Sequence, residues 1–164
     1  MKEIAILIAE GFEDVELIAT IDHLTRNDIR FKLFSIDGNK YEKGSYFAFV
    51  NTIPFKLEEV LKCDALFIPG GKAVSKFKKF KPCVNIINKF NDMKKGVFAI
   101  CAAPLLLENA GILKNVKFTA WPGLELKNST GNEVEVDKNI ITGRDYLSTL
   151  KFAEEVVKYF KKLD

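Results

Sequence analysis

Short, almost uninterrupted apolar runs alternate along this chain with segments whose apolar residues recur at helical spacing. The first run, KEIAILI at residues 2–8, is typical of a strand buried on both faces of a sheet. Leu17, Ile21 and Leu24 follow at helical spacing and predict a helix over residues 13–27. Such alternation indicates an α/β fold, a three-layer sandwich in which helices cover both faces of a mainly parallel central sheet.

The same patterns continue through the rest of the chain. A helix is expected to begin at Pro82, because Ile86, Phe90 and Met93 mark one apolar face and proline suits a first helical turn. Two further helices are expected at residues 104–110 and 150–160. Further strands are expected at residues 31–36, 46–50, 65–68, 97–100, 117–120, 133–136 and 139–142, of which 46–50 is an edge strand or hairpin arm.

The composition excludes several classes of protein. A chain of 164 residues, 48% hydrophobic and with 14 phenylalanines, can build one globular domain over residues 1–164 without disulfides or metal. A net charge of +3 does not indicate a nucleic-acid surface, and no apolar stretch reaches the roughly 18 residues of a membrane span. We therefore expect no nucleic acid, membrane, metal or cofactor as a partner.

The three cysteines, Cys63, Cys83 and Cys101, are too widely spaced for a disulfide framework or a paired metal site. With no signal-peptide pattern at the N-terminus, this usage favours a reducing compartment, and we expect a cytoplasmic location. Cys63 and Cys83 fit buried apolar positions. Cys101 differs, because it stands where the strand at residues 97–100 turns into a helix.

Strand exits are the expected places for chemistry, since ligands of parallel sheets bind beyond the carboxyl ends of the strands. Cys101, followed by small Ala102 and Ala103, fits a nucleophile elbow whose helix N-terminus is expected to lower the pKa of the thiol. The alternative is a small buried side chain. At another exit, Gly70 and Gly71 could offer backbone N–H groups to an oxyanion, or simply make a turn.

Four acidic residues follow the first strand: Glu10, Glu13, Asp14 and Glu16. Three of them are interpreted as complements of the helix dipole. Glu16 is expected to face inward, where burial raises the pKa of its carboxyl and couples it to the cysteine thiol. The single histidine, His23, lies too far along the helix to act as a base, which disfavours a Cys–His dyad.

Residues 72–81 carry the only dense basic run of the chain. Five lysines alternate there with Phe77 and Phe80. Such a run can attract an anionic ligand, but a solvated lid or helix face is favoured.

Four segments together resemble the ThiJ/PfpI superfamily: EGFEDVELI at residues 10–18, ALFIPGG at 65–71, VFAICAAPLLLENAGIL at 97–113 and IITGRDYLSTLKFAEEVV at 140–157. The resemblance spans residues 4–160. It is closest to the branch of the parkinsonism-associated protein deglycase, which is implicated in glyoxalase III activity, redox sensing and chaperone-like protection. The resemblance implies a flavodoxin-like fold, a homodimer and a reactive cysteine on a strained elbow.

By this resemblance, Cys101 matches the family's nucleophilic and oxidisable cysteine, and Glu16 matches the buried acid that hydrogen-bonds it. The positions whose backbone N–H groups line the oxyanion pocket are matched by Gly70, Gly71 and Ala102.

The resemblance also assigns two residues to the substrate pocket. Arg26 matches an arginine near the anion pocket of the deglycase branch. Trp121 precedes Pro122 in the segment where that branch usually has a histidine before a proline. If a pocket proton shuttle needs that histidine, turnover of methylglyoxal is expected to be weak or absent, and Trp121 is expected to shape or partly close an apolar pocket instead. Branches that act as peptidases carry histidine directly after the cysteine, and Ala102 at this position disfavours peptidase activity.

Two functions follow, from different classes. In the first, a cofactor-independent enzyme attacks methylglyoxal or its glycated adducts through Cys101, backbone N–H groups hold the oxyanion, and Glu16 moves the proton. In the second, Cys101 is oxidised in a redox-sensing or chaperone-like stress-protective protein with little or no turnover. A relative that binds ligands without turnover is a third alternative. We favour the enzyme, because the cysteine, the acid and both oxyanion segments are present.

Overall fold

A seven-stranded sheet forms the middle layer of the structure, a computed structural model that describes residues 2–163. The strand order is β5-β2-β1-β6-β7-β9-β8, and every neighbouring pair is parallel except β8 and β9. This confirms the predicted mainly parallel sheet. The strands are β1 (Glu3–Ile8), β2 (Arg30–Ser35), β5 (Ile53–Pro54), β6 (Ala65–Ile68), β7 (Gly96–Ile100), β8 (Val134–Asp137) and β9 (Ile140–Gly143).

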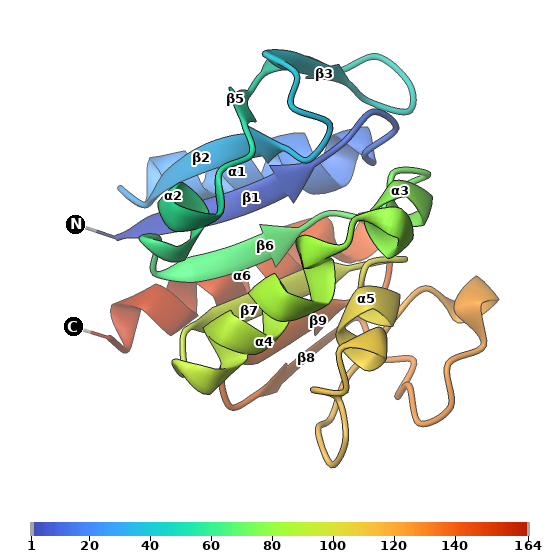
Figure 1. The fold of residues 1–164 in the computed structure, drawn as a ribbon. Helices are drawn as coiled ribbons and strands as arrows, with labels where there is room; N and C mark the ends of the chain where they lie inside the picture. The colour runs from blue at the N-terminus through green and yellow to red at the C-terminus, as the bar shows by residue number, and fades with distance from the viewer. Residues whose placement is uncertain (1, 164) are drawn as a thin grey trace.

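Helices cover both faces of the sheet (Figure 1). On one face α1 (Asp14–Arg26) packs beside α6 (Thr149–Lys161). The other face carries α2 (Leu57–Leu61), α3 (Val74–Lys79), α4 (Pro82–Asp92) and α5 (Pro104–Asn109). The remaining elements are the hairpin β3 (Tyr41–Lys43) and β4 (Phe49–Asn51) and two 3-10 turns, η1 (Pro122–Leu124) and η2 (Tyr146–Ser148). None of the helices within residues 2–163 has the length and apolarity needed to cross a membrane.

β6, β7 and β9 are buried along their whole length and β1 is buried from Ile4 onward, as continuous apolar runs require. Phe152 and Phe160 of α6 pack against Phe67 of β6 and Phe98 of β7, with ring centroids 5.4 and 6.3 Å apart. Each buried phenylalanine stabilises the fold by roughly 1.5–3 kcal/mol. Cys63 and Cys83 are also buried, as predicted.

The order in which the chain builds the sheet reverses between β1 and β6. β2 and β5 lie on one side of β1, and β6, β7, β9 and β8 lie on the other. Ligands of open α/β sheets bind at such a switch point, beyond the carboxyl ends of the strands. The segments that leave β1, β6 and β7 meet there, and they carry Gly11, Gly70 and Cys101.

Two strand predictions need correction. Residues 117–120 are not a strand, because the N–H groups of Lys117 and Thr119 donate to the side chains of Asp137 and Thr142 instead of to a neighbouring strand. Residues 46–48 form a loop, and only Phe49–Asn51 is a strand. The short elements β3, β5 and α2 were not expected, since segments of two to five residues carry little periodicity.

Candidate active site

Cys101 occupies a sharp turn directly after β7. Its backbone φ is 62°, in the left-handed region that costs energy for a residue other than glycine. Two backbone hydrogen bonds hold this conformation: the Cys101 N–H donates to Gly143 at 2.9 Å, and the Cys101 carbonyl accepts from Trp121 at 2.8 Å. The elbow predicted from the sequence is therefore a strained backbone turn fixed from both sides.

Gly70, at the exit of β6, lies against this turn. A Cβ atom on Gly70 would stand 2.8 Å from the Cβ of Cys101 and 3.0 Å from Oε2 of Glu16, so no larger residue fits here without movement. The Gly70 N–H donates to Oε2 of Glu16 at 3.3 Å. Because Gly70 has no side chain, Cys101 after β7 and Glu16 after β1 can approach each other beside the exit of β6.

Glu16 projects from the first turn of α1 into the interior and is fully buried. The side chain of Glu13 caps the helix by accepting the Glu16 N–H at 2.7 Å, which fixes the backbone from which Glu16 projects. Burial, aided by the charge of Glu13, raises the pKa of Glu16 to about 8, although its hydrogen bonds with Cys101 and Gly70 act in the opposite direction. The inward acid predicted from the sequence is confirmed, and at pH 7 it is largely protonated.

The thiol of Cys101 is not activated by a helix, and that prediction is wrong. Burial raises the pKa of the Cys101 thiol, and the neighbouring Glu16 carboxyl raises it further through its charge and its hydrogen bond. The backbone N–H of Ala102, next to the sulfur, opposes this shift. The helix effect is weak because α5 has only six residues and begins at Pro104, three positions later.

The three backbone N–H groups that the sequence analysis named as oxyanion donors differ in their availability. The N–H of Gly70 is already used by Glu16, so Gly70 is not a free oxyanion donor as the sequence suggested. The N–H of Ala102 faces the sulfur. Among the described residues, no hydrogen bond uses the N–H of Gly71, whose φ is 94° and whose absent Cβ would meet Gly11 and Glu13 at 2.5 Å. Of the three backbone N–H groups that the sequence analysis named, those of Gly71 and Ala102 are used by no hydrogen bond among the described residues.

The two residues assigned to the substrate pocket lie in different places. Arg26 ends α1, ten residues and therefore about 15 Å beyond Glu16, where its guanidinium pairs with Asp22 on the surface at 2.8 Å. Within one chain this places Arg26 at the far end of α1 from Glu16, and its place near an anion pocket stays a prediction. Trp121 does adjoin the elbow through its backbone hydrogen bond to Cys101, and its half-exposed ring lies over Gly123.

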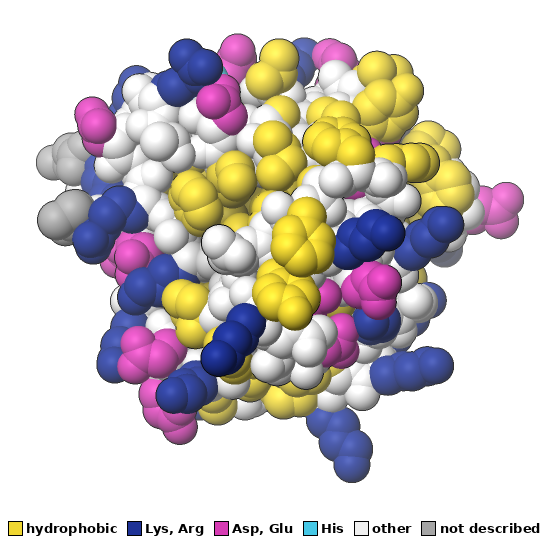
Figure 2. Space-filling model, turned by 90° about the horizontal axis from the view of Figure 1, so that it is seen from above, with side chains coloured by type: hydrophobic (Ala, Val, Ile, Leu, Met, Phe, Trp, Pro, Cys, Tyr) yellow, Lys and Arg dark blue, Asp and Glu magenta, His cyan; other side chains and the backbone are white. Residues whose placement is uncertain are grey.

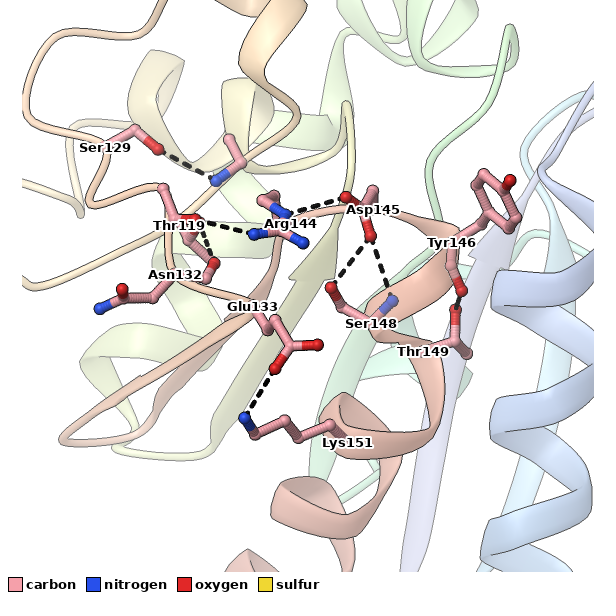
Figure 3. A network of polar contacts seen from close by, with 12 residues as sticks. Thr119, Ser129, Asn132, Glu133, Arg144, Asp145, Tyr146, Ser148, Thr149 and Lys151 are labelled. Carbon is pink, nitrogen blue, oxygen red and sulfur yellow. Dashed lines mark hydrogen bonds and ion pairs between the residues drawn. The ribbon is translucent and has the colours of Figure 1, made fainter.

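Sequence reasoning missed an ion pair at the exit of β9. Arg144 follows Gly143 and pairs with Asp145 at 2.9 Å, and Asp145 in turn accepts the N–H and hydroxyl of Ser148 (Figure 3). The charge of Asp145 adds to the causes that raise the pKa of Glu16. The signal was the GRD triplet at residues 143–145, which follows a predicted strand directly.

Comparisons with known proteins show which family the sequence matches. The model of the DJ-1/PfpI family matches residues 2–159. A deglycase of Pyrococcus horikoshii is 30% identical over 97% of this chain and 99% of its own length, and protein/nucleic acid deglycase 2 of Escherichia coli is 27% identical over 94% and 91%. Protein DJ-1 homolog B of Arabidopsis thaliana is 32% identical, but the chain spans only 38% of its length.

Solved structures support the same fold. The oxidized DJ-1 of Toxoplasma gondii superposes with a TM-score of 0.88 at 21% identity, covering 98% of this chain and 91% of that one. The DJ-1beta structure of Drosophila melanogaster gives a TM-score of 0.84 at 23% identity, covering 96% and 89%.

Proposed function

Because this chain belongs to the DJ-1/PfpI family, we propose that it is a deglycase-like enzyme that converts methylglyoxal, or the adducts methylglyoxal forms, by means of Cys101 and Glu16. Relatives named deglycases that the chain matches over nearly their whole length support this class of activity. The observation that carries the proposal is the contact of a buried carboxyl, with a pKa of about 8, and a cysteine on a strained elbow.

The proposed reaction begins with addition of the Cys101 thiol to the aldehyde carbon. A C–S bond forms, the carbonyl π electrons move to oxygen, and the thiol proton reaches that oxygen by way of Glu16, giving a hemithioacetal. In this proposal the N–H groups of Gly71 and Ala102, which no described hydrogen bond uses, stabilise the oxygen while it carries negative charge.

Glu16 then acts as a base. Its carboxylate removes the hydrogen from the former aldehyde carbon, an enediol forms, and return of the proton to the neighbouring carbon produces a thioester. Water cleaves the C–S bond, which releases lactate and restores the thiol. The sum is methylglyoxal plus water giving lactate, with no oxidant or cofactor consumed. A carboxyl with a pKa near 8 can both give and take protons near neutral pH.

The redox-sensing alternative requires an easily ionised thiol. Burial and Glu16 raise the pKa of Cys101, whereas oxidation is fastest at thiols of low pKa. We therefore place catalysis, in which Glu16 removes the thiol proton only during the reaction, ahead of sensing. Trp121 in place of the usual histidine leaves Glu16 as the proton carrier of this proposal.

We further propose that the protein is a cytoplasmic homodimer. Exposed apolar side chains gather on the hairpin and its continuation, on the face shown in Figure 2. We call this the hairpin surface, and it consists of Tyr41, Tyr46, Phe47, Phe49 and Ile53. Apolar patches of this kind are rarely left exposed in monomers, and a self-complementary patch favours a two-fold dimer.

The proposed function is tested by incubating the protein with methylglyoxal and measuring lactate. We expect lactate from the wild-type protein and none above background from Cys101→Ser, with Glu16→Gln lower than wild type by a factor of about 100 or more. Equal lactate formation by wild type and Cys101→Ser would contradict it. A parallel incubation uses a thiol or amine that methylglyoxal has already modified. Release of the unmodified thiol or amine together with lactate indicates deglycation, whereas lactate from free methylglyoxal alone indicates conversion of the free aldehyde.

A further inference from the structure

Asp14 is a buried carboxylate that no step of the proposed reaction uses. It is fully buried at the first position of α1. Its Oδ1 accepts the N–H of Tyr46 at 3.0 Å, and its Oδ2 accepts those of Phe47 and Ala48 at 2.7 and 2.5 Å. Burial alone would raise the pKa of Asp14, but the hydrogen bonds from the loop outweigh it and lower the pKa. The Asp14 carboxylate therefore holds the loop at residues 44–48. The sequence analysis interpreted Asp14 only as a complement of the helix dipole, and the structure corrects that interpretation.

The loop that Asp14 organises, residues 44–48, is closed tightly around the carboxylate. The Gly44 N–H donates to the carbonyl of Ala48 at 2.8 Å, which draws the two ends of the loop together. A Cβ on Gly44 would stand 2.5 Å from Oδ1 of Asp14, so the backbone approaches as closely as glycine permits. Tyr46 and Phe47, 78% and 73% exposed, stand outward at its tip.

This loop braces the exit of β1. The Ser45 N–H donates to the carbonyl of Phe12 at 2.9 Å, and the Ser45 hydroxyl donates to the carbonyl of Gly11 at 2.8 Å. The Gly11 N–H donates in return to Lys43 at 2.8 Å. Three hydrogen bonds therefore fix the backbone of residues 11–12 from the side of the hairpin.

The exit of β1 in turn holds the glycines beside Cys101. The Glu13 N–H donates to the carbonyl of Gly70 at 3.0 Å, and the Ala73 N–H donates to the carbonyl of Gly11 at 3.1 Å. Phe12 and Gly71 form an antiparallel bridge between these hydrogen bonds. Residues 70–73, which include Gly71, are thus hydrogen-bonded at both ends to the exit of β1. The loop at residues 44–48 holds that exit from the other side.

We propose that Asp14 is a positioning residue, which acts through the loop at residues 44–48 and the exit of β1 to hold the Gly71 N–H toward a substrate oxygen at Cys101. The inference rests on the proposed function, because it assigns a task to the same site. Asparagine cannot replace the carboxylate: its oxygen accepts, but its NH2 group only donates and would face a backbone N–H. A preorganised donor gains its catalytic value from being held in place before the reaction.

The test compares Asp14→Asn with Glu42→Gln. Glu42 is also a buried carboxylate of the hairpin region, accepting from Ser35 and Asn39, but has no described hydrogen bond to the exit of β1 or to residues 44–48. We expect Asp14→Asn to lower kcat for methylglyoxal about tenfold, with KM changed by less than about twofold, because an oxyanion donor acts in the transition state. Glu42→Gln should leave both constants within about twofold of wild type.

A second readout does not depend on turnover. Hydrogen–deuterium exchange over residues 65–76 should become faster in Asp14→Asn and remain unchanged in Glu42→Gln. Ser45→Ala, which removes one brace and leaves the carboxylate, should shift exchange and kcat in the same direction by a smaller factor. Because exchange can be measured whether or not methylglyoxal is converted, loss of the proposed function and loss of this inference are distinguishable.

Unchanged exchange over residues 65–76 in a folded Asp14→Asn protein would overturn the proposal. So would a rise in KM at constant kcat, which indicates ground-state binding, or an equal loss of kcat in Glu42→Gln, which indicates general loosening of the hairpin. If Asp14→Asn does not fold, Ser45→Ala decides alone: exchange or kcat identical to wild type would overturn the proposal.

Discussion

A neutral acid beside a neutral thiol is the arrangement that burial dictates for Glu16 and Cys101. Both groups are taken out of water, so each charged form is penalised, and the two groups titrate as a coupled pair. The resting protein avoids the cost of ionisation because both groups keep their protons, and in the proposed reaction the thiol loses its proton only as the sulfur bonds to carbon. Under the proposed mechanism, Cys101 therefore needs neither a histidine nor a helix dipole to act as the nucleophile.

Substituting Glu16 should make Cys101 easier to ionise. Glu16→Gln removes a neighbouring charge that raises the pKa of the thiol, so we expect alkylation of Cys101 by iodoacetamide at about pH 9 to become faster, by roughly tenfold for each unit of pKa lost. Intact mass and peptide mapping give the rates, and Cys63 and Cys83, whose pKa burial raises to about 11, serve as internal controls. Slower alkylation in the variant would show that Glu16 activates the thiol in the resting state.

Glu16 also predicts how stability depends on pH. Its pKa in the folded protein, about 8, lies above the ordinary value of 4.5, so the folded state binds the proton more tightly than the unfolded state. Its contribution to the free energy of unfolding is complete below about pH 4.5 and is lost as pH rises through 8. Denaturation at a series of pH values should show wild type losing stability relative to Glu16→Gln between about pH 5 and 9. A constant difference between the two proteins would contradict the raised pKa.

At the scale of elements, the site is made where three strand exits meet. Apolar runs and helical spacing predicted the principal strands and helices, because burial on both faces of a sheet leaves a clear pattern. They could not predict the loop conformation of residues 117–120, where backbone N–H groups donate to side chains. Nor could they predict the hydrogen bonds to Asp14, whose donors lie 32, 33 and 34 residues away in sequence. Tertiary hydrogen bonds of that kind leave no local signal.

Gly70→Ala tests the close approach of the exits of β6 and β7. The added methyl group would lie 2.8 Å from the Cβ of Cys101 and 2.9 Å from the carbonyl of Ile100, so we expect a loss of about 1–3 kcal/mol of unfolding free energy and severe loss of lactate formation. Gly131→Ala is the matched control, since nothing lies within 4 Å of its Cβ position and only its φ of 75° is strained. It should cost about 1 kcal/mol and leave activity intact. An active Gly70→Ala protein would refute the tight packing described for this site.

At the scale of the whole molecule, the two ends of the sheet differ in what they expose. The amino ends of β1 and β2 carry a surface ion pair, in which Lys32 lies 3.0 Å from Glu3. The carboxyl ends carry the candidate site, and the hairpin surface stands next to it on the loop that Asp14 anchors. If two copies bury that surface against each other, the loop at residues 44–48 would both form part of the dimer contact and hold the exit of β1 in place.

The hairpin surface should therefore decide the oligomeric state. Replacing Phe47, 73% exposed at the loop tip, with serine removes apolar area from the proposed contact without disturbing the core. We expect sedimentation velocity to give a dimer for wild type and a monomer, or dissociation at roughly tenfold or more higher concentration, for Phe47→Ser. Leu163→Ser, exposed near the C-terminus, is the control and should remain dimeric. A dimer unaffected by Phe47→Ser would place the contact elsewhere.

The most direct test of the Cys101–Glu16 chemistry is the pH dependence of lactate formation from methylglyoxal. Glu16 must be a carboxylate to remove the hydrogen from carbon, so kcat/KM should rise with pH and level off above an apparent pKa near 8, and this rise should disappear in Glu16→Gln along with most of the activity. A wild-type profile that is flat between about pH 6 and 9, or a variant that keeps both the rate and the rise, would contradict the assignment of Glu16 as the proton carrier.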